Sequence, residues 1–170
     1  MRRRRGRGAA GRALAGLASG LVASFIMEKA QARIMRLGGE ETLARERGAQ
    51  GDLEPATVRT AEKAARAVGR AIPDARKGAA GEAVHYATGA AFGALFGLLA
   101  PRIPAPLVVA GLAYGAAVWL LNDEALVPAL GLSRGPTAYP ASTHAKALAS
   151  HLVYGAATEV GFRLLGGARA

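Results

Sequence analysis

Residues 83–122 read AVHYATGAAFGALFGLLAPRIPAPLVVAGLAYGAAVWLLN, forty residues in which Arg102 is the only Lys, Arg, Asp or Glu. A helix at the surface of a water-soluble domain needs a polar face, which this stretch does not supply. Crossing the ~30 Å hydrocarbon core of a bilayer takes about 20 helical residues. Pro101 divides the stretch into two segments of about that length. We therefore predict two transmembrane helices, Ala83–Ala100 and Ala105–Asn122.

Two other segments have the length and apolar character of membrane spans. The first is Ala13–Met27, ALAGLASGLVASFIM, whose helical pattern continues to Arg36 because no Gly or Pro interrupts it. The other is Ser142–Leu165, with Ser142 or Thr143 as the expected N-cap and Gly166-Gly167 as the expected C-cap. The third span has a polar exit at Asn122-Asp123-Glu124. The predicted fold is all-α, a polytopic membrane helix bundle of about four transmembrane helices plus an amphipathic linker helix.

Composition and charge agree with this organisation. The 170 residues are 51% hydrophobic and include no cysteine, which excludes disulfides, thiolate zinc sites, iron–sulfur clusters and cysteine nucleophiles. The net charge is +10, and six arginines lie in the first twelve residues: Arg2, Arg3, Arg4, Arg5, Arg7 and Arg12. Beside a span such a run favours a cytoplasmic N-terminus, and no aromatic context supports nucleic-acid binding. The alternative is a secretory signal cleaved near EKAQA.

The chain divides into a basic N-terminal anchor (1–12), a first transmembrane helix with its extension (13–37), a polar linker (38–81) and a three-helix transmembrane region (82–170). Within the linker, Val58, Ala61, Ala65, Val68 and Ile72 recur at helical spacing, and Pro73 ends the pattern. Charged residues occupy the opposite side. Two interpretations are open, a basic helix lying on the membrane surface and an ordinary solvated linker helix.

Small residues recur at the four-residue spacing that lets membrane helices pack closely. They fall on all four predicted spans: Gly16 and Gly20, then Gly89, Gly93 and Gly97, then Gly111 and Gly115, and finally Gly155. We expect these faces to pack against another helix of the same chain, of a homo-oligomer or of a larger membrane complex. The alternative is that they reflect only an Ala/Gly-rich composition.

Ionisable residues lie at span ends that the connectivity places at one membrane face. These ends carry Glu28 and Lys29, Glu82 and His85, Asp123 and Glu124, and His144 and Lys146. His151 follows His144 by two helical turns, ~13 Å into its span at 1.5 Å per residue. Glu159 continues the same side of that helix towards the opposite face. Ionisable side chains inside a membrane usually face the interior of the bundle.

Several uses of this cluster are open. Imidazole and carboxylate groups suit a divalent metal, which His85, His144, His151, Glu28 and Asp123 would hold. His151 and Glu159 would form a proton path. The same residues would otherwise serve as interfacial caps and interhelical hydrogen bonds. A haem between His85 and His151 is a further, disfavoured arrangement.

The sequence leaves two function classes open. One is an ion-, metal- or proton-handling membrane protein, and the other is a non-catalytic accessory or structural subunit of a larger membrane complex. Polar residues that converge inside one bundle would favour the first class, and a glycine face directed at lipid would favour the second. We expect no enzymatic activity, because the chain has no P-loop, dinucleotide-binding fingerprint or nucleophile elbow.

Four stretches, GLASGLVASFIMEKA (16–30), VHYATGAAFGALFGLLAP (84–101), VPALGLSRGP (127–136) and ASHLVYGAATEVGFRLL (149–165), resemble the YagU-like inner membrane proteins, a domain family of unknown function. The resemblance implies a multi-pass protein of the inner (plasma) membrane. It places His85 on the family's histidine early in the second span. His151 and Glu159 fall on a histidine and a glutamate with the same eight-residue spacing. The chain departs from the family near Asp123, where the family has a histidine, and at residues 154–156, where the family has aromatics.

Overall fold

The computed structural model describes residues 8–103 and 107–166, which fold into helices without a strand in the described part. The long helices are α1 (Ala9–Ile34), α4 (Asp74–Leu99), α5 (Leu107–Val118) and α7 (Ala141–Leu164), and α2 (Glu40–Gln50) and α3 (Ala56–Ala67) lie in the linker. The remaining elements are the 3-10 turns η1 (Ala100–Arg102) and η3 (Pro136–Ala138), the π-helical segment η2 (Trp119–Leu126) and the short α6 (Val127–Ala129). The predicted all-α class is confirmed.

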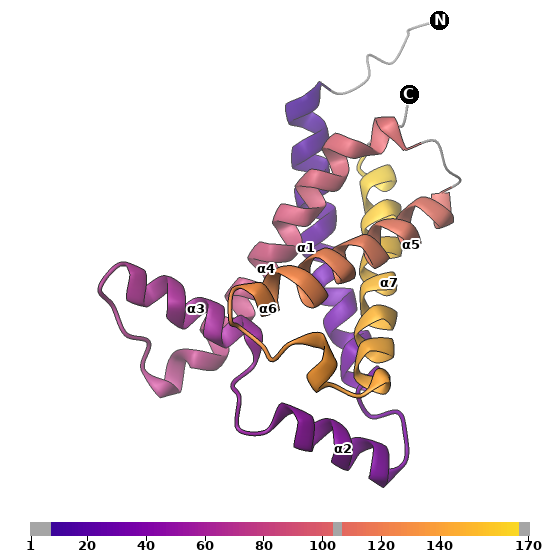
Figure 1. Cartoon of the computed structure of the whole chain (residues 1–170). Coiled ribbons are helices and arrows are strands. Elements are labelled where there is room, and N and C mark those ends of the chain that lie inside the picture. Colours follow the sequence, from indigo (N-terminus) through magenta and orange to yellow (C-terminus); the bar gives the residue numbers. More distant parts are fainter. Residues whose placement is uncertain (1–7, 104–106, 167–170) are drawn as a thin grey trace, which may run out of the picture.

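The long helices pack in the order α4, α1, α7, α5 (Figure 1). α1 contacts α4 on one side and α7 on the other, and α7 in turn contacts α5. α3 packs on the first half of α4, and α2 lies at the end of the bundle where α7 begins. The five Arg residues of the predicted anchor that precede residue 8 lie outside the described residues.

Two of the described helices are long and apolar enough to cross a membrane, Ala9–Ile34 and Asp74–Arg102. They correspond to the first and second predicted spans, although the second helix begins at Asp74, nine residues before the apolar stretch. The third predicted span corresponds to α5 with η2, and the fourth to α7. Length and hydropathy thus support a membrane-crossing helix at two of the four predicted positions.

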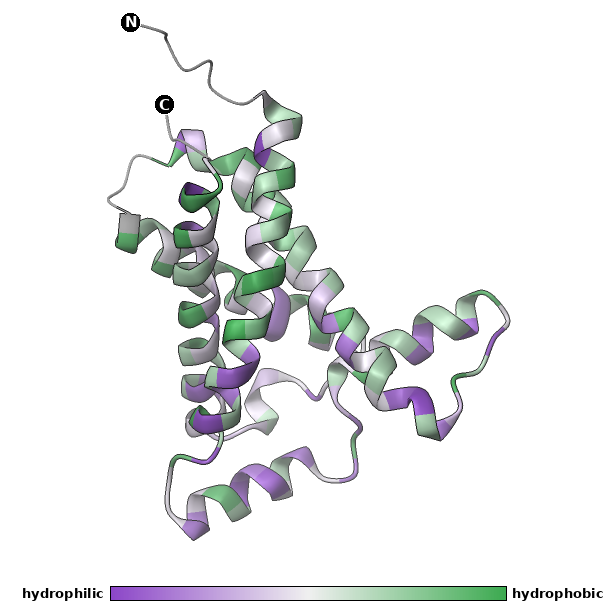
Figure 2. Ribbon diagram, turned by 180° about the vertical axis from the view of Figure 1, so that it is seen from behind, coloured by the Kyte–Doolittle hydropathy of each residue, from purple (hydrophilic) through white to green (hydrophobic). Residues whose placement is uncertain are grey.

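The outside of the bundle is more apolar than its interior. On α1 the exposed positions include Leu14, Leu17, Leu21 and Phe25. Its buried positions are small or polar, apart from Met27: Ala15, Gly16, Ser19, Gly20, Ala23 and Ser24. On α7 the buried face includes Ser150, His151, Thr158 and Glu159. Hydrophilic residues gather at the end of the bundle next to α2 and around α3 (Figure 2).

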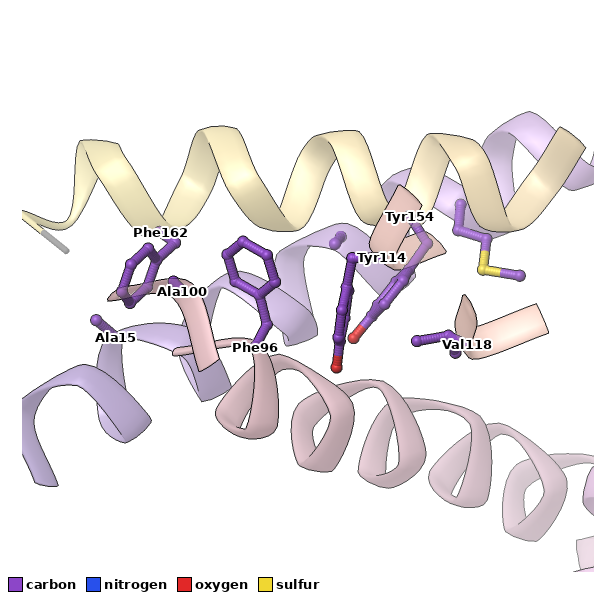
Figure 3. Packing of buried hydrophobic residues seen from close by; sticks show 9 residues of the cluster. Ala15, Phe96, Ala100, Tyr114, Val118, Tyr154 and Phe162 are labelled. Carbon is purple, nitrogen blue, oxygen red and sulfur yellow. The ribbon is translucent and has the colours of Figure 1, made fainter. Parts of the chain in front are cut away.

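The apolar core is small and aromatic. The ring of Phe96 on α4 lies edge-on against Tyr114 of α5 at 4.9 Å and against Phe162 of α7 at 5.6 Å between centroids (Figure 3). Such edge-to-face pairs add to the burial of apolar area. Two hydroxyls tie this core to α4, since Tyr114 donates to the carbonyl of Phe92 at 2.5 Å and Tyr154 donates to that of Gly89 at 2.6 Å.

The helix of the third predicted span does not end at the polar residues that follow it. The helix continues through Asn122-Asp123-Glu124 as η2 and then as α6, which ends at Ala129, two residues before Gly131 with its positive φ of 67°. A glycine in that conformation is the common helix terminator. The polar residues do not break the helix because a π segment keeps its backbone bonded, in an i→i+5 pattern. Asp123 and Glu124 therefore project from within a helix.

The expected N-cap of the fourth span is wrong. α7 begins at Ala141 with Pro140 in the capping position, and no side chain caps it. Ser142 and Thr143 therefore lie inside the first turn, where the amide of Thr143 donates to the carbonyl of Pro140 at 2.9 Å. The other end agrees with the prediction, because Gly166 follows the helix with φ 75°.

The linker contains one helix that the pattern predicted and one that it did not. α3 covers the predicted positions up to Ala65, while Val68 and Ile72 lie beyond its end. Its apolar residues Val58 and Ala61 are buried, and Val58 lies against Gly81 of α4. At these two positions the apolar face of α3 therefore packs on protein. α2 has no comparable apolar face and no buried residue.

Candidate functional site

An open cavity of about 1000 Å³ lies at the polar end of the bundle. Its walls come from α1, α3, α4, η2, α6 and α7, with the α2–α3 connection and residues 132–139 at the mouth. Most of the ionisable residues that the sequence placed at one membrane face line it: Glu82, His85, Asp123, Glu124, His144 and the deeper His151. Further in, Phe92, Leu95, Val118 and Tyr154 give the cavity an apolar wall.

The π-helical segment η2 positions both acidic residues of this cavity. A π-helix has more residues per turn than an α-helix, so consecutive side chains diverge less in direction. Asp123 and Glu124, although adjacent in sequence, can therefore both reach α7. Each contacts a different histidine of that helix. π segments occur frequently at functional sites, and here the segment forms a double His–carboxylate contact.

His151 and Asp123 form the deeper pair. His151 is nine-tenths buried, and its Nδ1 lies 3.0 Å from the carbonyl oxygen of Ala147. A carbonyl only accepts hydrogen bonds, so Nδ1 carries the hydrogen. The other ring nitrogen, Nε2, lies 3.7 Å from Oδ2 of Asp123, beyond hydrogen-bonding distance. In addition, the side-chain amide of Asn122 donates to Oδ1 of Asp123 at 2.8 Å.

His144 and Glu124 form the pair nearer the end of the bundle. Nδ1 of His144 lies 2.6 Å from Oε1 of Glu124, and Nε2 lies 3.0 Å from the carbonyl oxygen of Pro136. The ring of Tyr139 stands edge-on at 6.4 Å between centroids. Because both ring nitrogens face oxygen atoms, the pair holds one proton more than a neutral imidazole and a carboxylate together.

The remaining two predicted metal ligands make separate contacts. Nε2 of His85 lies 3.3 Å from the carbonyl oxygen of Ser24. Glu28 accepts hydrogen bonds from Tyr86 at 2.7 Å and from Lys29 at 2.5 Å. Within residues 8–103 and 107–166, no group of three His, Asp or Glu side chains is arranged to hold a metal ion. Of the predicted set of His85, His144, His151, Glu28 and Asp123, the structure therefore brings only His151 and Asp123 together.

Glu159 does not belong to the lining of this cavity. It is 1% exposed, and its carboxylate accepts a hydrogen bond from Nε of Arg163 at 2.8 Å. An arginine one helical turn away satisfies part of the charge that burial would otherwise penalise. The cavity thus reaches His151 and does not extend the predicted proton path to Glu159.

The predicted glycine faces meet one another within the chain. Gly16 and Gly20 of α1 lie against Gly89, Gly93 and Gly97 of α4. Gly111 and Gly115 of α5 lie against Gly155 of α7, where a Cβ atom on Gly155 would stand 2.7 Å from the Cα atom of Gly115. Such backbone-to-backbone packing needs residues without side chains. These contacts fix α4 against α1 and α5 against α7, and residues of α4 and of the helix that continues α5 line the cavity.

An ion pair that sequence reasoning missed joins α2 to α7. Nζ of Lys146 lies 2.6 Å from Oε2 of Glu46, and the two side chains are 9% and 14% exposed. Burial alone would raise the pKa of Glu46, but hydrogen bonds from Lys146 and Ser142 outweigh it and lower the pKa. The only local signal was that Lys146 shares the buried face of α7 with Ser150. A lysine on a buried face predicts a partner without saying which one.

The cavity mouth is held by main-chain contacts between distant segments. Arg134 donates to the carbonyl of Ala49 at 3.1 Å. Arg59 and Lys63 of α3 donate to the carbonyls of Gly131 at 2.9 Å and Leu130 at 3.0 Å, at the end of the helix formed by α5, η2 and α6. Cations near the last carbonyls of a helix are favourable. These contacts fix the linker against the segment that carries the two acidic residues.

Comparison of the chain with family models, with curated proteins and with solved structures gave no match.

Proposed function

We propose that the chain is a multi-pass protein of the inner (plasma) membrane that takes up and releases protons at the His–carboxylate pairs of its cavity. Its four spans would be α1, α4 with η1, the continuous helix of α5, η2 and α6, and α7. The resemblance to the YagU-like proteins points to the same location. The proposal assigns a proton-handling role and no catalytic step.

The surface of the bundle supports a lipid environment for more than the two most apolar helices. Large apolar side chains are exposed on α5 and η2 as well, including Val108, Val109, Leu120 and Leu121, the last being 62% exposed. α7 presents Val160 and Leu164 outwards and buries several polar residues, Lys146, Ser150, His151, Thr158 and Glu159. In water this distribution would leave apolar area unburied on every long helix, whereas in lipid it costs nothing.

The observation that carries the proposal is the geometry of His151 and Asp123. With Nδ1–H donated to Ala147, the second nitrogen of a neutral His151 presents a lone pair to the Asp123 carboxylate 3.7 Å away. Nε2 is therefore the atom of His151 that can accept a proton, and it faces the carboxylate. His144 and Glu124 hold a second proton through their 2.6 Å hydrogen bond. Both proton sites border the cavity, through which protons can be exchanged.

The other function class has less support from these contacts. An accessory subunit that binds its partner through a glycine-rich helix face would leave that face uncovered by its own helices and directed at lipid. In the described residues the faces of Gly16, Gly20, Gly93 and Gly155 are covered by other helices of the same chain. A metal role is not proposed, because within the described residues only His151 and Asp123 of the predicted ligands lie together.

Histidine NMR tests the proposal directly, because the chain contains three histidines and therefore only three imidazole rings whose nitrogen signals must be assigned. The protein, labelled with ¹⁵N-histidine, would be titrated in detergent between about pH 4 and 9, a range that brackets an ordinary imidazole. We expect Asp123→Asn to change the titration of His151 and leave that of His144 unchanged. Glu124→Gln should do the reverse.

The matched control is Glu41→Gln, an exposed acid in α2 outside the cavity. It should leave all three titration curves unchanged. If His151 and His144 take up no proton over this range, or if Asp123→Asn leaves the curve of His151 as in the wild type, the proposed function is wrong.

A further inference from the structure

We infer that the cavity binds an amphipathic organic cation, which exchanges with the proton held by Asp123 and His151. The inference rests on the proposed function and names the ligand class of the same site. Three observations carry it: the charge of the cavity walls, their apolar inner part and the gap between the two members of the deeper pair.

With Arg134 and the protons of the two pairs offsetting three carboxylates, the cavity walls are neutral, and they become negative when the deeper pair gives up its proton. Three carboxylates line them, Glu82, Asp123 and Glu124, whereas Arg134 is the one Lys or Arg among the described lining residues. Arg134 is also engaged at the mouth by its hydrogen bond to Ala49. A wall of one charge sign in a low-dielectric surrounding concentrates ligands of the opposite charge. This charge balance disfavours organic anions and favours cations.

The inner part of the cavity suits an apolar body. Phe92, Leu95, Val118 and Tyr154 line it beside the polar residues. A volume of about 1000 Å³ is at the upper end of the range of sites for drug-sized ligands. Aromatic faces also attract cations. A small inorganic ion would leave this apolar surface without a partner, so an organic cation with apolar substituents fits better.

The gap between His151 and Asp123 is where the charged group of the bound cation would lie. Oδ2 of Asp123 is separated by 3.7 Å from Nε2 of His151, and the Asp123 side chain is 33% exposed. The neighbouring groups are Asn122 and Glu124 on η2, His144 on α7, and Glu82 and His85 on α4. A bound cation beside Asp123 would replace the proton that the pair takes up. One positive charge then enters as one proton leaves to water, so the charge of the site is conserved.

Tetraphenylphosphonium and tetraphenylborate provide a matched pair of probes, equal in shape and opposite in charge. Their binding to the purified protein in detergent micelles would be measured by equilibrium dialysis, with protein-free micelles as the blank. We expect the cation to bind above the blank and the anion not to. Affinity for the cation should fall by about tenfold or more in Asp123→Asn, as for loss of a close charge partner, and should be unchanged in Glu41→Gln. Equal binding of both probes, or wild-type affinity in Asp123→Asn, would overturn the cation site.

Proton release separates this inference from the proposed function. Calorimetry of tetraphenylphosphonium binding in two buffers of different ionisation enthalpy counts the protons released. We expect about one proton per bound cation near the pH at which His151 titrates, and binding should weaken as the pH falls. Cation binding without proton release would overturn the proton exchange and with it the proposed function. Absence of cation binding in a protein whose histidines titrate as predicted would overturn the cation site alone.

Discussion

Gly93 of α4 lies so close to Gly20 of α1 that a Cβ atom added to Gly93 would stand 2.6 Å from the Cα atom of Gly20. The same added atom would also collide with the carbonyl oxygen of Gly16. Backbone atoms cannot rotate away as a side chain can, so any larger residue must move one helix. Close packing along this ridge is therefore the main constraint on the α1–α4 pair.

Gly93→Ala should lower the thermal stability of the protein in detergent, because the added methyl group meets backbone atoms on two sides. Overpacking of this kind typically costs about 1–3 kcal/mol. Gly78→Ala is the matched control, since Gly78 lies on the same helix with no atom within 4 Å of an added Cβ. It should be neutral or stabilising by up to about 1 kcal/mol, the difference in helix propensity. Equal melting temperatures for the two variants would contradict the packing.

Tyr154→Phe and Tyr114→Phe should each destabilise the bundle by about 0.5–1.5 kcal/mol, the usual net value of a lost hydrogen bond. Each hydroxyl donates to a main-chain carbonyl of α4, at Gly89 and Phe92 respectively. Chemical unfolding in mixed micelles would measure the loss. Tyr139→Phe serves as the control, because the hydroxyl of Tyr139 has only a 3.4 Å contact with the amide of Arg134. Its effect should be the smallest of the three.

The ion pair between Glu46 and Lys146 should contribute to stability at neutral pH and lose that contribution in acid. The pKa of Glu46 is lowered in the folded protein. Its contribution is therefore fully present above the unfolded-state value, about 4.3 for an ordinary glutamate, and is lost as the pH falls through the lower folded-state value. The difference in melting temperature between wild type and Glu46→Gln should be constant from about pH 5 to 8 and shrink below about pH 4.3.

Glu41→Gln is the control for this titration, because Glu41 is an exposed residue of the same helix. It should give a smaller difference from the wild type at neutral pH. A Glu46→Gln difference that persists unchanged to about pH 3, well below the ordinary glutamate value, would show that the stabilisation does not come from the ion pair.

Topology reporters fused after Gly48 and after Arg134 should lie on the same side of the membrane, and a reporter after Pro101 should lie on the other. Arg134 donates to the carbonyl of Ala49, next to Gly48, so the first two sites are at one end of the bundle. Pro101 belongs to η1, which follows α4 at its other end. Opposite results for Gly48 and Arg134 would mean that the four-span arrangement is wrong.

Features that depend on neighbouring residues could be predicted from the sequence. The uninterrupted apolar run before Met27 and the stop at Pro101 located α1 and the end of α4. The positive φ of Gly166 agrees with the glycine C-cap expected there. Glycines at a spacing of four predicted close helix faces, because residues four apart share one side of a helix. Each of these features is encoded within a few turns of chain.

Features that depend on contacts between distant residues were decided by the tertiary structure. Periodicity could not show that Gly20 faces Gly93, or that Lys146 reaches back 100 positions to Glu46. From the sequence, the third span was predicted to end at Asn122, because polar residues normally mark the end of a membrane span. The packed bundle offers Asp123 and Glu124 two histidines of α7, so the helix continues as a π segment. A local pattern lists which side chains share a face, but only the folded chain determines what that face meets.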